Sequence, residues 1–472
     1  MQSQRYSLRS GALHLFGGSL AGRGLSFLLN TVLSRVLGPD SLGLFALVLT
    51  ASQTFEVTVR GGVDYGLQCA LTNQDIKASD QDLKQTASAA LRWISVATAL
   101  IGLVLLLWVG YWQGLLPIEM PMSRELATGL LLMISCSESL GGLPWDLLLI
   151  KGRSKLVSLK QGLFAPIKLA AAVIGGYFLG IEGALTGYAV ASIAQTVWIR
   201  EQTKPYVFSS GNLLVGGWSK TWHLIQTGLP LYATNSISAV VFLPLLAGVA
   251  VSAGISDVGY LRIGQLVVQL FTLIPGAIAP ILFLRLRQAK DHTDRTKEAQ
   301  KSLQLVWTLG LIFLLLYCLI DSQLILVLFG EDFLPSLQAT RILVLCAILD
   351  SCSQILYTPL LASQRTGLFA TVQNGAALLA GLAGWALIPE YGLTGFLMAK
   401  LVFAWIPITC FSIDTLQNLE QRNHLLSLLI ASALFLPLCW SSNWGSLPQQ
   451  FLLVLIIGIL IIRCWHLRGM LS

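Results

Sequence analysis

The chain has 472 residues, of which 55% are hydrophobic and only 11% are charged, and its mean hydropathy is +0.72. A soluble domain carries about 25% charged residues, so this composition excludes a soluble globular protein and indicates a polytopic membrane protein. The formal net charge of +7 is spread over short clusters between apolar runs, a pattern that argues against nucleic acid as a partner.

Apolar segments follow one another along the whole sequence. A helix needs about 20 mostly apolar residues to cross a bilayer core about 30 Å thick. Division at charged residues, prolines and glycines predicts about fourteen such helices and an all-α polytopic fold. The predicted spans lie near 11–33, 42–63, 88–110, 126–150, 157–179, 183–200, 229–251, 258–284, 303–320, 339–362, 367–388, 393–416, 424–441 and 449–465.

Basic residues are distributed unevenly between the predicted loops. Most of the 30 lysines and arginines lie at the N-terminus or in every second loop, whereas the alternate loops hold Arg35, Arg124 and Arg341. Cytoplasmic loops carry the excess of Lys and Arg. We therefore predict that both termini are cytoplasmic and that the protein is a multi-pass protein of the cell inner (plasma) membrane.

The two halves of the chain resemble each other after a shift of 212 residues. The aligned polar pairs are Glu138 and Asp350, Ser139 and Ser351, Arg153 and Arg365, and Gln161 and Gln373. Removal of four residues then aligns "EGALTG" (182–187) with "EYGLTG" (390–395). We predict two six-helix repeats of the same orientation, residues 1–207 and 208–420, and two additional transmembrane helices in 421–472. Transporters built from repeats bind substrate between their halves.

Charged residues inside the spans are the candidate functional residues, because a charge near the bilayer centre costs about 2.5–3.5 kcal/mol and normally faces protein or water. In the second span, Glu56, Arg60 and Asp64 follow one another at four-residue intervals and therefore share one helix face. This stripe has two readings. It is either a self-neutralising structural feature or part of a functional site.

Three further bases lie inside spans without an acid at helical spacing. They are Arg23 in the first span, Lys168 in the fifth and Arg262 in the eighth, where Gln265 and Gln269 extend a polar stripe. A partner for each base must come from another helix or from a ligand. Basic groups in a cavity suit an anionic substrate such as a phosphate or pyrophosphate.

Two acids occupy equivalent positions in the two halves. Glu138 lies in the fourth span and Asp350 in the tenth, while Lys400 lies in the twelfth. The acids either bind a coupling proton or sodium ion, or they pair with Lys168 and Lys400. The sequence leaves both readings open.

The cysteines predict no chemistry. The eight cysteines show neither CxxC nor Cys/His metal spacing, and most fall inside apolar runs, as expected of small buried side chains. We found no nucleotide-binding loop and no nucleophile elbow. The sequence therefore predicts no metal, no cofactor and no enzymatic activity. Coupling of transport to a proton or sodium gradient is left open.

Two stretches carry a family resemblance. "GRGLSFLLNTVLSRVLGPDSLGLFALVL" (22–49) and "LFGEDFLPSLQATRILVLCAILDSCSQILYTPLLASQRTG" (328–367) resemble the polysaccharide transporter family. That family includes O-antigen and exopolysaccharide flippases and belongs to the multidrug/oligosaccharidyl-lipid/polysaccharide exporter (MOP) superfamily. The resemblance implies a V-shaped fold with two six-helix lobes. It also implies a carrier that flips a polyprenyl-pyrophosphate-linked oligosaccharide across the inner membrane by alternating access.

The resemblance also implies partners and site residues. The partners are the lipid-linked oligosaccharide, membrane lipids, and the polymerase and export machinery of lipopolysaccharide or exopolysaccharide synthesis. Arg23, Arg60 and Arg262 are similar to cavity arginines of the more distantly related lipid II flippases, although a further basic position of those proteins is Leu29 here. The predicted pyrophosphate-binding residues are Arg23, Arg60, Lys168, Arg262 and Lys400. The predicted residues for ion coupling or charge pairing are Glu56, Asp64, Glu138 and Asp350.

Two other functions are compatible with parts of this pattern. A multidrug or cation efflux carrier of the same fold is expected to have an acidic and aromatic cavity, which the embedded bases do not favour. A polytopic polysaccharide polymerase or ligase is expected to carry catalytic groups on a large outer loop. The longest outer loops, near 113–125 and 321–339, lack such a set.

Overall fold

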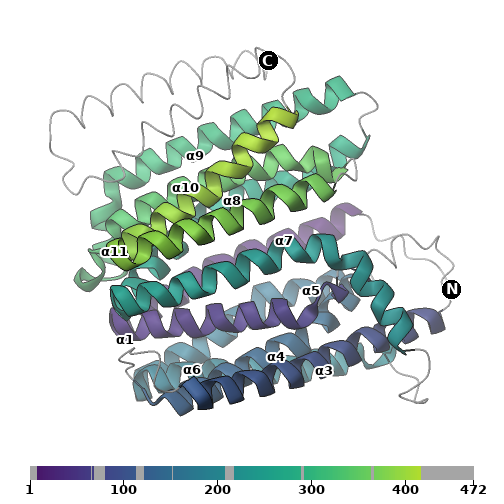
Figure 1. Cartoon of the computed structure of the whole chain (residues 1–472), viewed down its shortest axis with the longest axis horizontal. Coiled ribbons are helices and arrows are strands. Elements are labelled where there is room, and N and C mark those ends of the chain that lie inside the picture. Colours follow the sequence, from purple (N-terminus) through teal and green to yellow (C-terminus); the bar gives the residue numbers. More distant parts are fainter. Residues whose placement is uncertain are drawn as a thin grey trace. The chain divides into compact units, whose positions relative to one another are not determined.

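The computed structural model describes residues 8–64, 66–67, 80–112, 122–150, 153–207, 217–288, 292–362 and 366–415. Every regular element in these ranges is a helix (Figure 1), which confirms the predicted all-α fold. The elements are α1 (Leu8–Arg60), α3 (Asp80–Trp112), α4 (Arg124–Ile150), α5 (Ser154–Leu159), the π-helix η1 (Lys160–Phe164), α6 (Ala165–Val207), α7 (Gly217–Ser252), α8 (Ile255–Gln288), α9 (His292–Leu328), the 3₁₀-helix η2 (Glu331–Phe333), α10 (Ser336–Ala362) and α11 (Thr366–Thr415).

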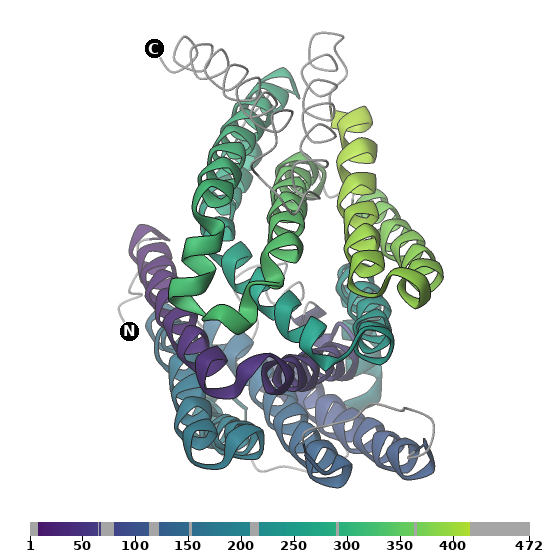
Figure 2. The ribbon, with the colours of Figure 1, turned by 90° about the vertical axis from the view of Figure 1, so that its left-hand side faces the viewer.

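Three helices, α1, α6 and α11, have 43 residues or more, and each contains a break at a glycine. The breaks lie at Gly38 in α1, Gly180 in α6 and Gly392 in α11, with φ angles of 72°, 61° and 52°. Only glycine adopts positive φ values readily, so the chain changes direction at these points and each helix has two arms (Figure 2). Each of the three therefore carries two of the predicted spans.

Eight helical segments in the described ranges are long and apolar enough to cross a membrane. The first twelve predicted spans fall on helices. The spans predicted near 424–441 and 449–465 lie outside the described residues, so the total of fourteen stays a prediction.

The structure corrects the alignment of the two halves. Gly392 follows Gly180 by 212 residues, the same interval that separates Asp350 from Glu138. The close backbone contacts in the two helical hairpins, Gly175 with Gly183 and Leu387 with Gly395, repeat at that interval too. No four-residue gap is needed. "EGALTG" begins after its turn whereas "EYGLTG" contains its turn, so the two similar stretches are out of structural register.

The chain forms two compact units, Met1–Gly259 and Tyr260–Ser472. In the first unit, α6 packs against both α1 and α4, and α3 packs against α4 and α7. In the second unit, α10 packs against α9 and α11. The lobe boundaries predicted near 207 and 420, and the V-shaped arrangement implied by the family resemblance, stay predictions.

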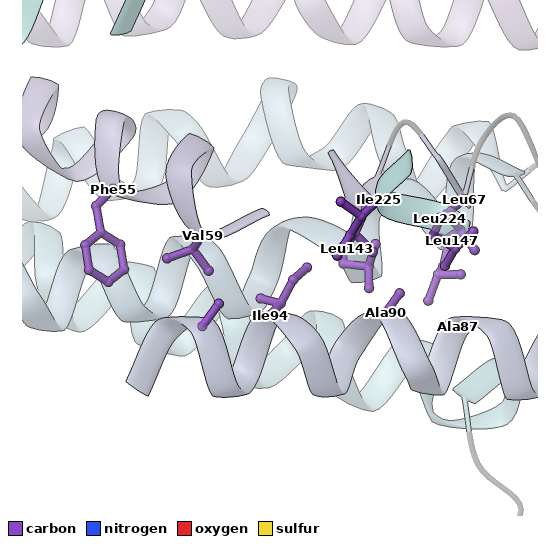
Figure 3. Packing of buried hydrophobic residues seen from close by; sticks show 12 residues of the cluster. Phe55, Val59, Leu67, Ala87, Ala90, Ile94, Leu143, Leu147, Leu224 and Ile225 are labelled. Atoms are coloured by element: carbon purple, nitrogen blue, oxygen red, sulfur yellow. The ribbon is translucent and has the colours of Figure 1, made fainter. Parts of the chain in front are cut away.

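A cluster of apolar side chains holds four elements of the first unit together (Figure 3). It joins the end of α1 and the residues after it to α3, α4 and α7, through side chains such as Val59, Ile94, Leu143 and Leu224, each at most 2% exposed. Lipid tails are as apolar as leucine, so close van der Waals packing rather than exclusion of water stabilises such contacts in a membrane.

A buried ion pair joins α9 to α10 in the second unit. Arg341 Nε lies 2.5 Å from Asp321 Oδ2, and the two side chains are 5% and 4% exposed. Asp321 also accepts a hydrogen bond of 2.6 Å from the backbone N–H of Ser322. The pattern of basic residues predicts that Arg341 lies in a loop. The structure instead places Arg341 inside α10, where the carboxylate compensates its charge.

Candidate functional site

Arg60 lies at the end of α1 among three carboxylates. Its guanidinium is paired with Glu56, and Nη1 lies 3.5 Å from Asp64 Oδ2 and 3.8 Å from Asp146 Oδ2. Glu56 and Asp64 are the acids that helical spacing placed on this face. Asp146 comes from α4 and is not among the residues predicted from the sequence. The Arg60 side chain is only 16% exposed, so these acids supply most of its polar surroundings.

Helix α4 provides the space as well as the third acid. A Cβ atom built on Gly142 would overlap the Arg60 guanidinium. Gly142 lies one turn before Asp146, so both positions are on the same face of α4. The four-residue spacing between Gly142 and Asp146 is the sequence signal that could have identified Asp146. Asp146 lies near the end of the predicted span, where a charged residue is expected without any functional role.

Lys168 also has a carboxylate partner on another helix. Its Nζ lies 2.6 Å from Glu138 Oε1, and the same oxygen accepts a hydrogen bond of 2.9 Å from Ser192 Oγ. The Lys168 Nζ is 5.4 Å from the ring centroid of Tyr188. Lys168 is 7% exposed. Of the two readings of Glu138, charge pairing is thus the observed arrangement, and an ion-coupling role stays a prediction.

A π-helical turn places a further base, Lys160, near both of these groups. Lys160 interacts electrostatically with Glu56, Asp146 and Glu138, and its Nζ lies 6.0 Å from the Trp145 ring centroid. Lys168 follows Lys160 by eight residues, and in a regular α-helix this spacing would set the two side chains about 80° apart around the helix axis. The π turn η1 contains about one extra residue per turn. The two side chains therefore lie within about 20° of each other around the axis. No sequence signal used above predicts such a turn.

The described charges of this region form one network with a small excess of acid. We call it the Arg60–Lys168 network. Its bases are Arg60, Lys160 and Lys168, and its acids are Glu56, Asp64, Glu138 and Asp146. No group of acids, histidines and cysteines in the described residues has the geometry of a metal site. The bases of this region are therefore compensated within the protein.

The second unit contains a related acid–base pair whose lysine lies at a different position in the sequence. Asp350 on α10 interacts electrostatically with Lys400 on α11, whose Nζ lies 5.9 Å and 5.8 Å from the rings of Phe396 and Phe403. At the 212-residue interval, Asp350 is equivalent to Glu138, but Lys400 is equivalent to Tyr188. The two acids thus occupy equivalent positions in the predicted repeats. The base comes from the first hairpin arm in one half and from the second arm in the other.

The remaining two predicted bases have different surroundings. Arg262 on α8 is half-buried, and its Nη1 donates a hydrogen bond of 3.4 Å to Gln265 Oε1, within the predicted polar stripe. Arg23 on the first arm of α1 is exposed. The structure thus brings Arg60 and Lys168 into one network in the first unit. Arg262 and Lys400 belong to the second unit.

Comparison with known proteins shows the fold. No protein-family model and no curated protein matches the sequence. The structure is similar to "Lipid II flippase MurJ, inward closed conformation", with a TM-score of 0.72 and 14% identity over 97% of this chain and 100% of that chain. It is also similar to an inward-facing multidrug resistance MATE family transporter of the MOP superfamily, with a TM-score of 0.64 and 12% identity over 86% of this chain and 96% of that chain.

A third similar structure is a MOP superfamily transporter from Pyrococcus furiosus, with a TM-score of 0.56 and 12% identity over 89% of this chain and 96% of that chain. These neighbours are transporters rather than enzymes. At such low identities the likeness establishes a shared fold.

Proposed function

We propose that this chain is a membrane carrier of the MOP superfamily that flips a polyprenyl-pyrophosphate-linked oligosaccharide by alternating access. The observation that carries the proposal is the similarity to a lipid II flippase over 97% of this chain and 100% of that chain. The resemblance of residues 22–49 and 328–367 to polysaccharide flippases supports an O-antigen or exopolysaccharide repeat unit as the cargo. The proposed location is the inner membrane, with the polymerase and export machinery as partners.

Among the predicted substrate-binding residues, Arg23 now has the strongest support. It is exposed on the first arm of α1, whereas Arg60 and Lys168 already contact carboxylates. Arg262 and Lys400 are secondary candidates in the second unit. A charge-assisted hydrogen bond to the pyrophosphate contributes about 1.5–3 kcal/mol, so loss of Arg23 should weaken binding about ten- to a hundredfold.

The test is binding of undecaprenyl pyrophosphate to the purified protein, measured for Arg23→Ala and Arg23→Lys. Alanine should lose most of the affinity, and lysine should retain part of it because it keeps the charge without the guanidinium fork. Arg35→Ala, on the exposed surface of the same helix, is the matched control. Unchanged affinity in well-folded Arg23→Ala protein would contradict the proposed role of Arg23.

We further propose that transport is coupled to a proton or sodium gradient through Glu138 and Asp350. The support is their equivalent position in the two repeats and their pairing with bases. Glu138→Gln and Asp350→Asn proteins in vesicles should then lose the response of transport to an imposed gradient. A response equal to that of the unaltered chain would remove these acids from the coupling mechanism.

A multidrug or cation efflux carrier is the second candidate. Two observations favour it: the similarity to a MATE family transporter, and the excess of acids in the Arg60–Lys168 network. Uptake of a fluorescent cationic dye into inside-out vesicles distinguishes the two candidates. Dye transport without binding of undecaprenyl pyrophosphate would favour efflux.

A further inference from the structure

The exposed aromatic side chains of the protein gather at two turns. Among the side chains that the structure describes, the exposed Phe, Tyr and Trp residues are Tyr177, Phe178, Trp222, Trp385 and Tyr391. All of these except Trp222 lie within about two helical turns of Gly180 or Gly392, the glycines at the turns of α6 and α11. Exposed leucine, isoleucine and valine side chains are instead distributed along the helices. The aromatic residues therefore mark the ends of the two helical hairpins.

The turn of α6 carries three consecutive apolar side chains, which we call the first tip. Tyr177, Phe178 and Leu179 are 75%, 74% and 72% exposed. The rings of Tyr177 and Phe178 meet edge to face, with their centroids 5.4 Å apart. The two arms behind them are in backbone contact, because a Cβ atom on Gly187 would overlap the carbonyl oxygen of Ala171. A closely packed hairpin thus presents an apolar tip to its surroundings.

The turn of α11 carries a second tip that consists of Trp385 and Tyr391. Tyr391 directly precedes Gly392, and at the 212-residue interval it is equivalent to Leu179. Trp385 lies about two helical turns earlier and is 78% exposed. The residue types differ between the two tips. Exposure of large aromatic side chains at the turn is what the two hairpins share.

Helix lengths place each tip about one bilayer core away from the other end of its arm. Arg200 follows the turn at Gly180 by 20 residues, which in a helix corresponds to about 30 Å, the thickness of the hydrocarbon core. Arg200 is exposed, whereas exposed side chains between it and the turn are mainly apolar, as at Val190 and Val197. In α11, Trp385 lies 19 residues after the first residue of the helix, or about 28 Å.

A carboxylate beside each turn limits how deeply the tips lie. Glu182 and Glu390 are exposed and lie two residues from Gly180 and Gly392. An exposed carboxylate avoids the hydrocarbon core, whereas a cluster of exposed apolar side chains is unfavourable in water. The headgroup layer, about 5–7 Å thick on each side of the core, accommodates both. Tyr and Trp suit this layer because one end of the side chain is apolar and the other is polar.

We propose that each tip is an interfacial anchor that docks into the headgroup layer of the bilayer. The partner is lipid rather than a second protein, because the exposed side chain of Ile174, one turn below Phe178, continues the apolar surface of the first tip along the membrane-spanning arm. The first tip is the stronger anchor, since three adjacent apolar side chains enter the layer there. Under the predicted topology both tips lie in the outer leaflet. The proposal is independent of the cargo.

The first test measures depth in phosphatidylcholine vesicles that contain the full chain with its native cysteines replaced. A nitroxide label reports collisions with oxygen, which dissolves in lipid, and with a nickel chelate supplied on both sides, which stays in water. Labels on Phe178→Cys and Tyr391→Cys should both lie in the headgroup layer. A label on Ile174→Cys should lie about 6 Å deeper than the label at 178, because four helical residues separate them. Asp332→Cys, in an exposed turn, is the water reference.

Two outcomes of this measurement would overturn the proposal. If the label at 178 is as accessible to nickel as the label at 332, the first tip lies in water and is left for a protein partner. If the label at 178 is as deep as the label at 174, the tip is an ordinary part of the lipid-facing surface. The same criteria apply to Tyr391.

The second test asks whether the first tip holds the hairpin at its depth. Phe178→Ser should move the label on Ile174→Cys toward water, by up to about one helical turn or 5 Å. Val190→Ser is the matched control, because Val190 is also exposed on α6 but lies about 15 Å from the turn. It should leave the label where it was. Tyr177→Ser provides a second variant of the tip if Phe178→Ser does not fold. An unchanged depth in folded tip variants would show that the tip is not an anchor.

Discussion

At the residue scale, the embedded charges are distinguished by where their partners lie. Glu56 and Asp64 are one turn away from Arg60 on the same face, so spacing alone identified them. Asp146 and Glu138 reach their bases from another helix, and a sequence does not specify which helix faces which. Pairing of Glu138 with Lys168 was one of two alternatives from the sequence, and only the packing of α4 against α6 selects it.

The Glu138–Lys168 pair gives the first prediction. Removing one member of a buried pair leaves an uncompensated charge and costs about 3–5 kcal/mol, whereas replacing both members by apolar residues is often neutral. Lys168→Met should therefore lower the thermal unfolding midpoint of the detergent-purified protein. The double variant Glu138→Leu, Lys168→Met should recover most of the loss. A double variant that is less stable than Lys168→Met would contradict the pairing.

Gly142 gives a second prediction at this scale. Gly142→Ala places a methyl group where the Arg60 guanidinium lies, and overpacking of this kind costs about 1–3 kcal/mol. Gly129→Ala, on the same helix but facing open space, should cost nothing or stabilise slightly. The measurement is again the thermal unfolding midpoint. Equal midpoints for the two variants would mean that the guanidinium has another position.

At the element scale, helix types and most helix positions follow from apolar length, but turns within long helices do not. The first hairpin contains Gly175, Gly176, Gly180 and Gly183 within nine positions, so several glycines were candidates for the turn. The similarity of "EGALTG" to "EYGLTG" selected the wrong register. The π turn at Lys160 was equally unpredictable, because no local residue pattern indicates it.

The hairpin turn in α11 gives the third prediction. Gly392 has φ 52° and ψ −123°, a region that costs a residue with a side chain about 1–3 kcal/mol. Gly392→Ala should therefore lower the thermal unfolding midpoint. Gly375→Ala on the same helix, where a Cβ atom meets nothing within 4 Å, should not. If both variants unfold at the same temperature, the turn does not depend on glycine.

At the scale of the whole molecule, the apolar composition and the length of the spans were sufficient to predict an all-helical membrane fold. The bilayer core requires both apolar side chains and helices of about 20 residues. The division into units was harder to anticipate. The predicted repeat assigns α7 to the second half, yet the glycine contacts at Gly62, Gly66 and Gly228 attach α7 to α1. The compact unit accordingly extends to Gly259. An internal repeat reflects how a segment arose, whereas a compact unit reflects the contacts that the segment makes in the folded chain.

Membrane orientation gives the fourth prediction. The bias of basic residues predicts that the turn containing Asp332 faces outward and that Lys297 lies on the cytoplasmic side. A cysteine at position 332, which is exposed, should react with a membrane-impermeant maleimide in intact cells, and a cysteine at position 297 should react only after permeabilisation. The reverse pattern would invert the predicted topology.

The different origins of the two lysines have a consequence for synthesis of the protein. Glu138 meets its lysine 30 residues later in the chain, whereas Asp350 must wait for Lys400, about 50 residues later. At about 5–20 residues per second, the additional ~20 residues keep Asp350 waiting for its lysine about 1–4 s longer than Glu138 waits for Lys168 during synthesis. If translation stops or slows between α10 and the second arm of α11, α10 is therefore expected to remain in the insertion machinery with Asp350 uncompensated. We expect such chains to be degraded by membrane quality-control proteases.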